Sequence, residues 1–177
     1  MSKFISFTEL QQSEFWQFFH IRVDSEQTDS KGIFYKLKPG GFQSEIDLMI
    51  HTTMTGELQS GFLAMVRSWV TGPPYGINLF ALDITRSFVS AMMSWPDSRE
   101  EIKTVRELFD DKYVREYAQL LSRNEPPALE HAATLNTYLG ASEKSQATIG
   151  SFDIWLKNGM VEERKALVIT THVTKAG

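Results

Sequence analysis

The hydrophobic periodicity of this 177-residue chain changes twice along the sequence. The resulting order of strand-like and helix-like segments constrains the fold more than any other feature. Before the Pro73-Pro74 turn, apolar residues alternate with polar ones, as in strands that pack on one face. After it they recur every three or four residues, as in helices, and near the C-terminus the alternation returns. Strands and helices segregated in this way indicate an α+β fold with an antiparallel sheet, because a parallel α/β fold alternates the two.

The N-terminal third is expected to supply most of the sheet. Alternating patterns predict strands at residues 33–38, 45–52 and 61–70. Thr55-Gly56 is expected to form the hairpin turn between the last two of these strands. The polar segment 25–32 is rich in turn-forming residues and is expected to be a break in the sheet.

The first 23 residues are expected to begin with a short helix. Ser6 and Glu9 have the spacing of a capping box for a helix at about residues 7–13. Residues 15–23 are crowded with aromatic and β-branched side chains. We favour a strand there over a continuation of the helix, because such side chains fit a pleated surface.

The middle of the chain is expected to form a block of about four helices. Asn78 is a good N-cap for a helix that runs to about Ser94. This helix is apolar on most sides, so we expect it to be the central, buried one. Three further helices are expected. The first starts at Ser98 and the second at Asp110 or Asp111. The third runs from Pro127 to a C-cap at Gly140.

The C-terminus is expected to return to the sheet as a hairpin. Its arms are predicted at Thr148–Leu156 and Ala166–Val173, with Asn158-Gly159 as a turn. Two strands alone are barely stable, so the hairpin should join the N-terminal strands. The sequence thus predicts one α+β domain over residues 1–177, with its antiparallel sheet packed against the helical block.

Composition excludes several classes of function. The chain has no cysteine, which excludes disulfides, thiolate metal sites and cysteine nucleophiles. The longest uninterrupted apolar run is Phe62–Val66, which is too short to cross a membrane. The N-terminus lacks the apolar segment of a secretory signal, so a cytoplasmic location is expected.

Charge argues against a general nucleic-acid-binding surface. The formal net charge is -4, from 18 basic and 22 acidic residues, whereas non-specific nucleic-acid binding needs a basic surface. Lys31, Lys36 and Lys38 are interpreted as a solvated strand face. Nucleic-acid binding would require these lysines to share one surface with Arg22.

No catalytic, metal-binding or cofactor-binding motif is recognised, and we assign none. Two histidines nevertheless have similar settings near the ends of predicted strands, His51 and His172. If those strands were neighbours, the two imidazoles and a carboxylate from Glu45 or Asp47 would form a polar cluster able to bind a ligand or move a proton. The simpler interpretation is two ordinary hydrogen-bonded strand residues.

A second polar candidate lies in the predicted central helix. Asp83 and Arg86 are three residues apart, which puts them on neighbouring positions of one helical face. Charged residues in so apolar a helix often mark a site, because a buried charge must be paired. An ion pair at the edge of the core is the alternative.

The turn at residues 71–76 is the candidate for protein binding. Two prolines stiffen it, and it carries Tyr75 close to Trp69. A linker between the last strand and the central helix is the structural alternative. A second aromatic-basic segment, with His20 and Arg22 beside Trp16, is interpreted as a half-buried sheet face.

These observations favour a small cytosolic protein-binding domain of the inhibitor, immunity-protein or chaperone type, without catalytic activity of its own. The alternative is an enzyme or small-ligand-binding domain with a pocket between the sheet and the central helix. A protein partner is expected and a membrane partner is not. The sequence leaves the identity of the partner and the oligomeric state open.

Overall fold

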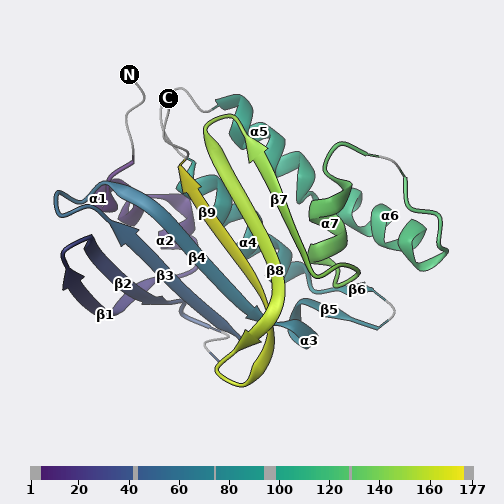
Figure 1. Cartoon of the computed structure of the whole chain (residues 1–177), viewed down its shortest axis with the longest axis horizontal. Helices are drawn as coiled ribbons and strands as arrows, with labels where there is room; N and C mark the ends of the chain where they lie inside the picture. Colours follow the sequence, from purple (N-terminus) through teal and green to yellow (C-terminus); the bar gives the residue numbers. More distant parts are fainter. Residues whose placement is uncertain (1–4, 42–43, 74, 94–98, 128, 174–177) are drawn as a thin grey trace.

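The sheet joins both ends of the chain, as the sequence predicts. A computed structural model describes residues 5–41, 44–73, 75–93, 99–127 and 129–173 (Figure 1). The large sheet has the strand order β1-β2-β3-β4-β9-β8-β7, and every neighbouring pair is antiparallel. Its strands are β1 (Arg22–Asp29), β2 (Gly32–Lys38), β3 (Ile46–Thr52), β4 (Leu58–Val66), β7 (Lys144–Ile149), β8 (Phe152–Val161) and β9 (Arg164–Val173).

The helices of the middle block follow β4 in the chain. A short helix, α3 (Arg67–Val70), and a two-stranded ribbon of β5 (Thr71–Gly72) and β6 (Gly76–Ile77) lead into them. The helices are α1 (Phe7–Gln11) and α2 (Glu14–Phe18) before the sheet, then α4 (Leu79–Met92), α5 (Arg99–Leu108), α6 (Asp111–Ser122) and α7 (Ala132–Tyr138). The fold is therefore α+β, with an antiparallel sheet and a helical block as expected.

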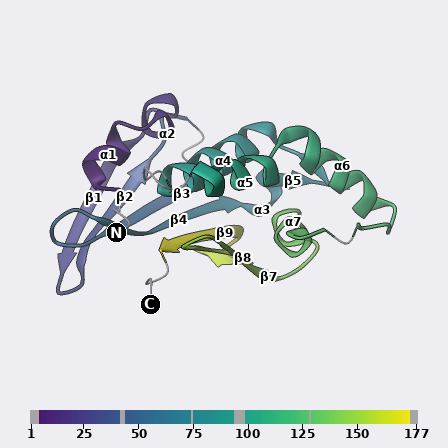
Figure 2. The same ribbon diagram turned by 90° about the horizontal axis from the view of Figure 1, so that it is seen from above.

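The helices cover one face of the sheet. Figure 2 shows α1, α2, α4 and α5 on the same side, with the strands below them. The central helix α4 begins at its predicted cap, where Oδ1 of Asn78 accepts hydrogen bonds from the amides of Phe80 and Ala81. It packs on β4 and β9, and Phe88 in its middle is completely buried. The other face of the sheet carries no helix in the described part of the chain (Figures 1 and 2).

Close packing of α4 on the sheet depends on a glycine in β4. A Cβ atom added to Gly61 would lie 2.7 Å from Cζ of Phe88 and 3.0 Å from the sulfur of Met92. Such distances are shorter than van der Waals contact, so a side chain at position 61 would displace the Phe88 ring or the Met92 side chain.

The strand expected at residues 15–23 is wrong except for Arg22 and Val23, which begin β1. Residues 14–18 form α2, and the hydroxyl of Ser13 caps it by accepting a hydrogen bond from the Trp16 amide at 3.3 Å. Phe15 and Phe19 are four residues apart and both are buried, so the helical period places them on the same side. Packing of these two rings overrides the strand propensity of the segment.

The expected break at residues 25–32 is also wrong in part. Most of it belongs to β1, the edge strand, and every residue of β1 is exposed. A strand that buries neither face shows no apolar alternation, so its sequence resembles a loop. The turn itself is confined to the step from Asp29 to Gly32, which are paired across the hairpin.

The C-terminal hairpin is present, but its turn is not where the sequence places it. Asn158 and Gly159 lie inside β8, and the β8–β9 turn is formed by Glu162 and Glu163. Both glutamates have positive φ, 48° and 68°, as a two-residue type I′ turn requires. Glutamate rarely adopts positive φ, so these two residues do not indicate a turn in the sequence. The strand expected at 148–156 is divided between β7 and β8.

The remaining boundaries shift by a few residues. The helix expected from Pro127 to Gly140 is shorter, because α7 starts at Ala132. The Ser6 cap is confirmed, since its hydroxyl accepts from the Glu9 amide at 3.0 Å. Ser98, the cap expected for α5, and Ser94, the end expected for α4, lie outside the described residues.

Candidate functional site

The large sheet has one face that carries no helix in the described residues. Along β3, the buried residues Ile46, Leu48 and Ile50 face the helices, and the partly exposed Met49 and His51 face the other way. We call this second side the open face. In Figure 1 the sheet lies in front of α4, so the reader looks onto the open face.

A polar row crosses the open face from strand to strand. His51 on β3 is paired with Ser60 on β4, Ser60 with His172 on β9, and His172 with Asp153 on β8. Nε2 of His172 lies 3.5 Å from Oδ2 of Asp153. The hydroxyl of Thr148 on β7 donates to Oδ1 of Asp153 at 2.6 Å. The carboxylate thus has a partner on each side.

The two candidate histidines share this row, but they do not meet. Ser60 stands between His51 and His172, so the imidazoles are separated by two strand spacings, ~10 Å. Nε2 of His51 instead hydrogen-bonds the carbonyl oxygen of Lys31 at 3.2 Å. Asp47 does lie on the same face, one step along β3 from the buried Leu48. Among the described residues, no group of three histidine, aspartate or glutamate side chains is close enough to hold a metal ion.

Aromatic side chains accompany the polar row. The rings of Phe34 and His51 are stacked, with centroids 4.2 Å apart and planes at 6°. The rings of Trp155 and His172 are also stacked, with centroids 6.5 Å apart. The next row along the strands pairs Met49 with Phe62, which extends the apolar area between the two stacks. Trp155 and Met49 are 44% and 39% exposed, so a partner can bury them.

Cations lie at two opposite edges of the open face. Arg22 and Lys38 are paired across β1 and β2, and Lys36 is on the same side of β2. Lys144 and Lys157 are paired across β7 and β8. The structure thus places on one surface Arg22, Lys36 and Lys38, which are three of the four cations that nucleic-acid binding would require there. Lys31 is set apart in the β1–β2 turn, where its amide donates to Oδ1 of Asp29.

The Asp83–Arg86 pair forms, but Arg86 is mainly a helix cap. Its guanidinium contacts Oδ1 of Asp83, donates to the carbonyl oxygen of Phe109 at 2.8 Å and approaches Oδ1 of Asp111 at 3.4 Å. It therefore neutralises the end of α5, where carbonyl groups lack helical partners. The side chains of Arg86 and Asp83 are 23% and 43% exposed, so the pair lies at the edge of the core.

Asp83 and Arg86 also line a groove on the helical side. Its volume is about 1050 Å³, and it runs between α1–α2 and α4. Glu9, Glu14 and the 68%-exposed Phe18 form the opposite wall. The groove is in the outer helical layer, whereas the interface between the sheet and α4 is filled with buried side chains.

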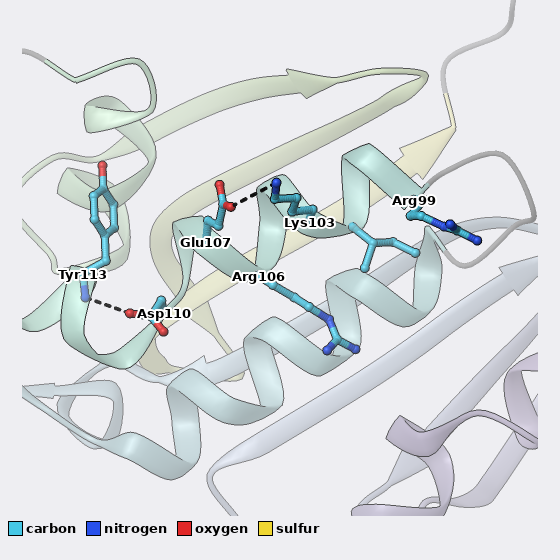
Figure 3. A pocket seen from close by; sticks show the side chains of 7 residues that line it. Arg99, Lys103, Arg106, Glu107, Asp110 and Tyr113 are labelled. Carbon is cyan, nitrogen blue, oxygen red and sulfur yellow. Dashed lines mark hydrogen bonds and ion pairs between the residues drawn. The ribbon is translucent and has the colours of Figure 1, made fainter.

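A second hollow lies over α5 and the start of α6 (Figure 3). It has a volume of about 680 Å³ and is lined mainly by charged residues of both signs. Nζ of Lys103 lies 4.0 Å from Oε1 of Glu107, and Asp110 caps α6 by accepting from the Tyr113 amide at 3.1 Å. The Lys103–Glu107 pair and the Asp110 cap therefore stabilise α5 and α6.

The aromatic candidates of the 71–76 turn are not displayed on its surface. Trp69 and Tyr75 are only partly exposed and both pack against the core. The Trp69 ring meets Phe80 edge-on at 6.0 Å. The carbonyl oxygen of Trp69 accepts from the side-chain amide of Asn78. These contacts fasten the turn to the start of α4, so they fit the linking role.

Sequence reasoning missed a partly buried arginine that holds the helical block to the sheet. Arg67 on α3 donates to the carbonyl oxygen of Tyr138 at 2.6 Å, to Oδ1 of Asn158 at 2.6 Å and to the Thr71 hydroxyl at 2.8 Å. Burial lowers the pKa of the Arg67 guanidinium, and burial also raises the pKa of the neighbouring Tyr138. Arg67 is an isolated arginine in an apolar stretch, which was the available signal.

The comparisons add no relative. No protein-family model, curated protein or solved structure matches this chain. No helix in the described part of the chain is long and apolar enough to cross a bilayer. The geometry of the open face is therefore the basis for any functional conclusion.

Proposed function

We propose that this chain is a cytoplasmic protein-binding domain that docks its partner on the open face of the large sheet. The observation that carries the proposal is a sheet covered on one side only, with Met49, Phe62 and Trp155 on the uncovered side. It acts by binding, in the manner of an inhibitor, an immunity protein or a chaperone. The aromatic and methionine side chains are of the types that protein interfaces favour.

The dimensions of the open face suit a protein partner. Seven strands at a spacing of ~4.8 Å span ~29 Å, and seven residues of β3 span ~23 Å. The face therefore offers roughly 650 Å², close to the ~800 Å² that each partner buries in a standard interface.

The edges of the sheet are less suited to binding than its face. β1 is an edge strand and carries Arg22, Asp24, Glu26 and Asp29, and charges on an edge oppose pairing with another strand. At the other edge, α7 packs against β7. A partner therefore gains more from covering the open face than from extending the sheet.

Site-specific photo-crosslinking tests this proposal. A photo-reactive amino acid replaces Trp155 on the open face, and in a matched control it replaces Phe18, which is more exposed but lies in the helical layer. We expect one dominant protein to be crosslinked from position 155 in cells of the natural source, and none from position 18. Crosslinking from position 18 alone would contradict the proposal.

Small-ligand binding is the second candidate function, and the groove that contains Asp83 and Arg86 favours it. Its volume, about 1050 Å³, is slightly above the roughly 300–1,000 Å³ that is usual for ligand sites. A ligand screen by thermal shift on the full chain tests it. A compound that raises the melting temperature of the native chain, and fails to do so for Asp83→Ala, would support this function.

A further inference from the structure

Strand pairing aligns the outward-facing side chains of the open face in three parallel rows. Each row crosses β3, β4, β9 and β8, and neighbouring rows are two residues apart along a strand, ~7 Å. From β3 to β8, the polar row is His51, Ser60, His172 and Asp153, the middle row is Met49, Phe62, Thr170 and Trp155, and the third row is Asp47, Ala64, Val168 and Lys157.

The middle row is the apolar line of the open face. Met49 and Trp155 are 39% and 44% exposed, and Phe62 between them is partly exposed. The charged side chains lie in the rows on either side of it. A line of this kind suits the axis of a two-fold dimer, because each residue on such an axis meets its own copy.

A two-fold axis along the middle row would stack a second copy on the open face. Rotation by 180° about this axis places each strand over the same strand of the second copy and reverses its direction. The polar row of one copy then faces the third row of the other. Sheets that pack face to face lie ~10 Å apart with their strands within about 30°, and this axis permits that packing.

The stack brings opposite charges together on two strands. On β8, Asp153 faces Lys157 of the second copy, and on β3, His51 faces Asp47 of the second copy. Within one chain, Lys157 is paired with Lys144, and neither lysine has an ion pair with a residue that the structure describes. The second copy therefore supplies Lys157 with a carboxylate, and symmetry forms each contact twice.

The other symmetric stack, with its axis along β4, does not complement the charges. Rotation about the strand direction places each row over itself and β2 over β8 of the second copy. Lys38 would then face Lys157, and Asp153 would face Phe34. Asp47, which lies on the same face, would face Val168 and lose its contact with water. Charge therefore selects the axis along the middle row.

Lys36 carries the main cost of the selected stack, because it lies on the middle row in β2 and would meet its own copy. Its side chain is exposed and β2 is next to the edge strand, so the ammonium group can extend past the edge to water. Removal of this charge should tighten the dimer, which gives the axis a distinctive signature.

We infer that a second copy of this chain covers the open face of the purified protein, in a two-fold dimer whose axis follows the middle row. This inference rests on the proposed function, since it uses the open face as a protein-binding surface, and it names one occupant of that surface. Two open faces of roughly 650 Å² bury about 1,300 Å² together, at the lower end of the ~1,200–2,000 Å² of stable interfaces. We therefore expect a Kd of about 10–100 µM, so that a sample at about 1 µM reports on the folding of the monomer.

A single cysteine tests the axis directly, because the native chain contains no cysteine. Thr170→Cys puts a thiol on the middle row, and Phe18→Cys puts one on the helical layer as the control. A short bismaleimide can join two thiols across the ~10 Å between facing sheets. At about 100 µM chain, we expect it to crosslink Thr170→Cys at least about fivefold more than Phe18→Cys. Equal crosslinking of the two variants would overturn the inference.

Charge reversal tests the cross-copy contact between Asp153 and Lys157. Lys157→Glu puts two acidic residues on β8 and Asp153→Lys puts two lysines there, so each variant repels its own copy. Sedimentation equilibrium should show that each raises the dimer Kd at least about tenfold, while an equimolar mixture returns to within about threefold of the native value. Lys112→Glu, an exposed change on α6, should leave the Kd unchanged. Recovery in the mixture also shows that both variants fold.

Lys36→Ala should lower the dimer Kd at least about twofold, because it removes the only cation that meets its own copy among the described residues of the middle row. Three results would overturn the inference: a native chain that stays monomeric at about 500 µM, a mixture of the reversed variants that does not associate, and a Lys36→Ala variant that dimerises more weakly. The proposed function would survive each of these results if position 155 still crosslinks one protein in cells. Its own failure is the absence of any crosslink there, so the two failures are distinguishable.

Discussion

Lys144 and Lys157 face each other directly across β7 and β8 on the open face. Their repulsion costs folding stability, because like charges directly opposite each other in a sheet are unfavourable. Reversal of one of the two charges should therefore stabilise the fold.

We expect Lys157→Glu to raise the free energy of unfolding by about 0.2–1 kcal/mol, because it turns a like-charge pair into an opposite one. The gain corresponds to a melting temperature higher by up to ~4 °C in a chain of this size. Thermal unfolding at low salt measures it, and high salt should reduce the gain. A lower melting temperature would show that the lysines do not repel.

Arg67 links three parts of the fold through hydrogen bonds to Tyr138, Asn158 and Thr71. Arg67→Ala leaves partly buried carbonyl groups without a donor, so we expect a loss of about 3 kcal/mol in the free energy of unfolding. Urea unfolding measures the loss. Arg115→Ala, an exposed change on α6, should stay within about 0.5 kcal/mol. Equal effects of the two substitutions would disprove the role of Arg67.

Gly61 lies under Phe88 and Met92 of the central helix. A methyl group there would displace the buried Phe88 ring or the Met92 side chain, and we expect Gly61→Ala to lower the free energy of unfolding by about 1–3 kcal/mol. Gly72→Ala is the matched control, because a Cβ at that position meets no atom within 4 Å. A neutral Gly61→Ala would mean that α4 is packed more loosely than the structure shows.

Tyr138 is completely buried, and its burial raises the pKa of its phenol. Above about pH 10 the unfolded chain can release this proton and the folded chain cannot, so alkali lowers the free energy of unfolding. We expect Tyr138→Phe to reduce this loss by up to ~1.4 kcal/mol for each pH unit above 10. Urea unfolding at pH 8 and pH 11 measures it. The same alkaline loss in both proteins would contradict this account.

Much of the fold could be predicted from the sequence because most elements bury one face. Ile46, Leu48 and Ile50 alternate with exposed residues, and that alternation identifies β3 and its inner side. The failures have a physical cause as well. β1 buries neither face, and Glu162 and Glu163 turn the chain in a conformation that glutamate rarely adopts.

The candidate site could be predicted only in part, because it depends on strand order. Periodicity places His51 and His172 on the same type of face, but it does not reveal that Ser60 separates them. In the same way, the sequence does not reveal that Lys38 and Lys157 lie in one sheet, because this depends on the pairing of β4 with β9, which joins the two ends of the chain.

The most direct test of the central claim is the Kd of the partner crosslinked at position 155, measured for two double variants. Met49→Ala/Trp155→Ala removes apolar area from the open face, and Phe18→Ala/Leu79→Ala removes exposed apolar side chains from the helical layer. We expect the first variant to raise the Kd at least about thirtyfold, as the loss of interface hot spots does, and the second to leave it unchanged. An unchanged Kd for the first variant and a raised Kd for the second would show that the partner binds the helical layer, and would contradict the account.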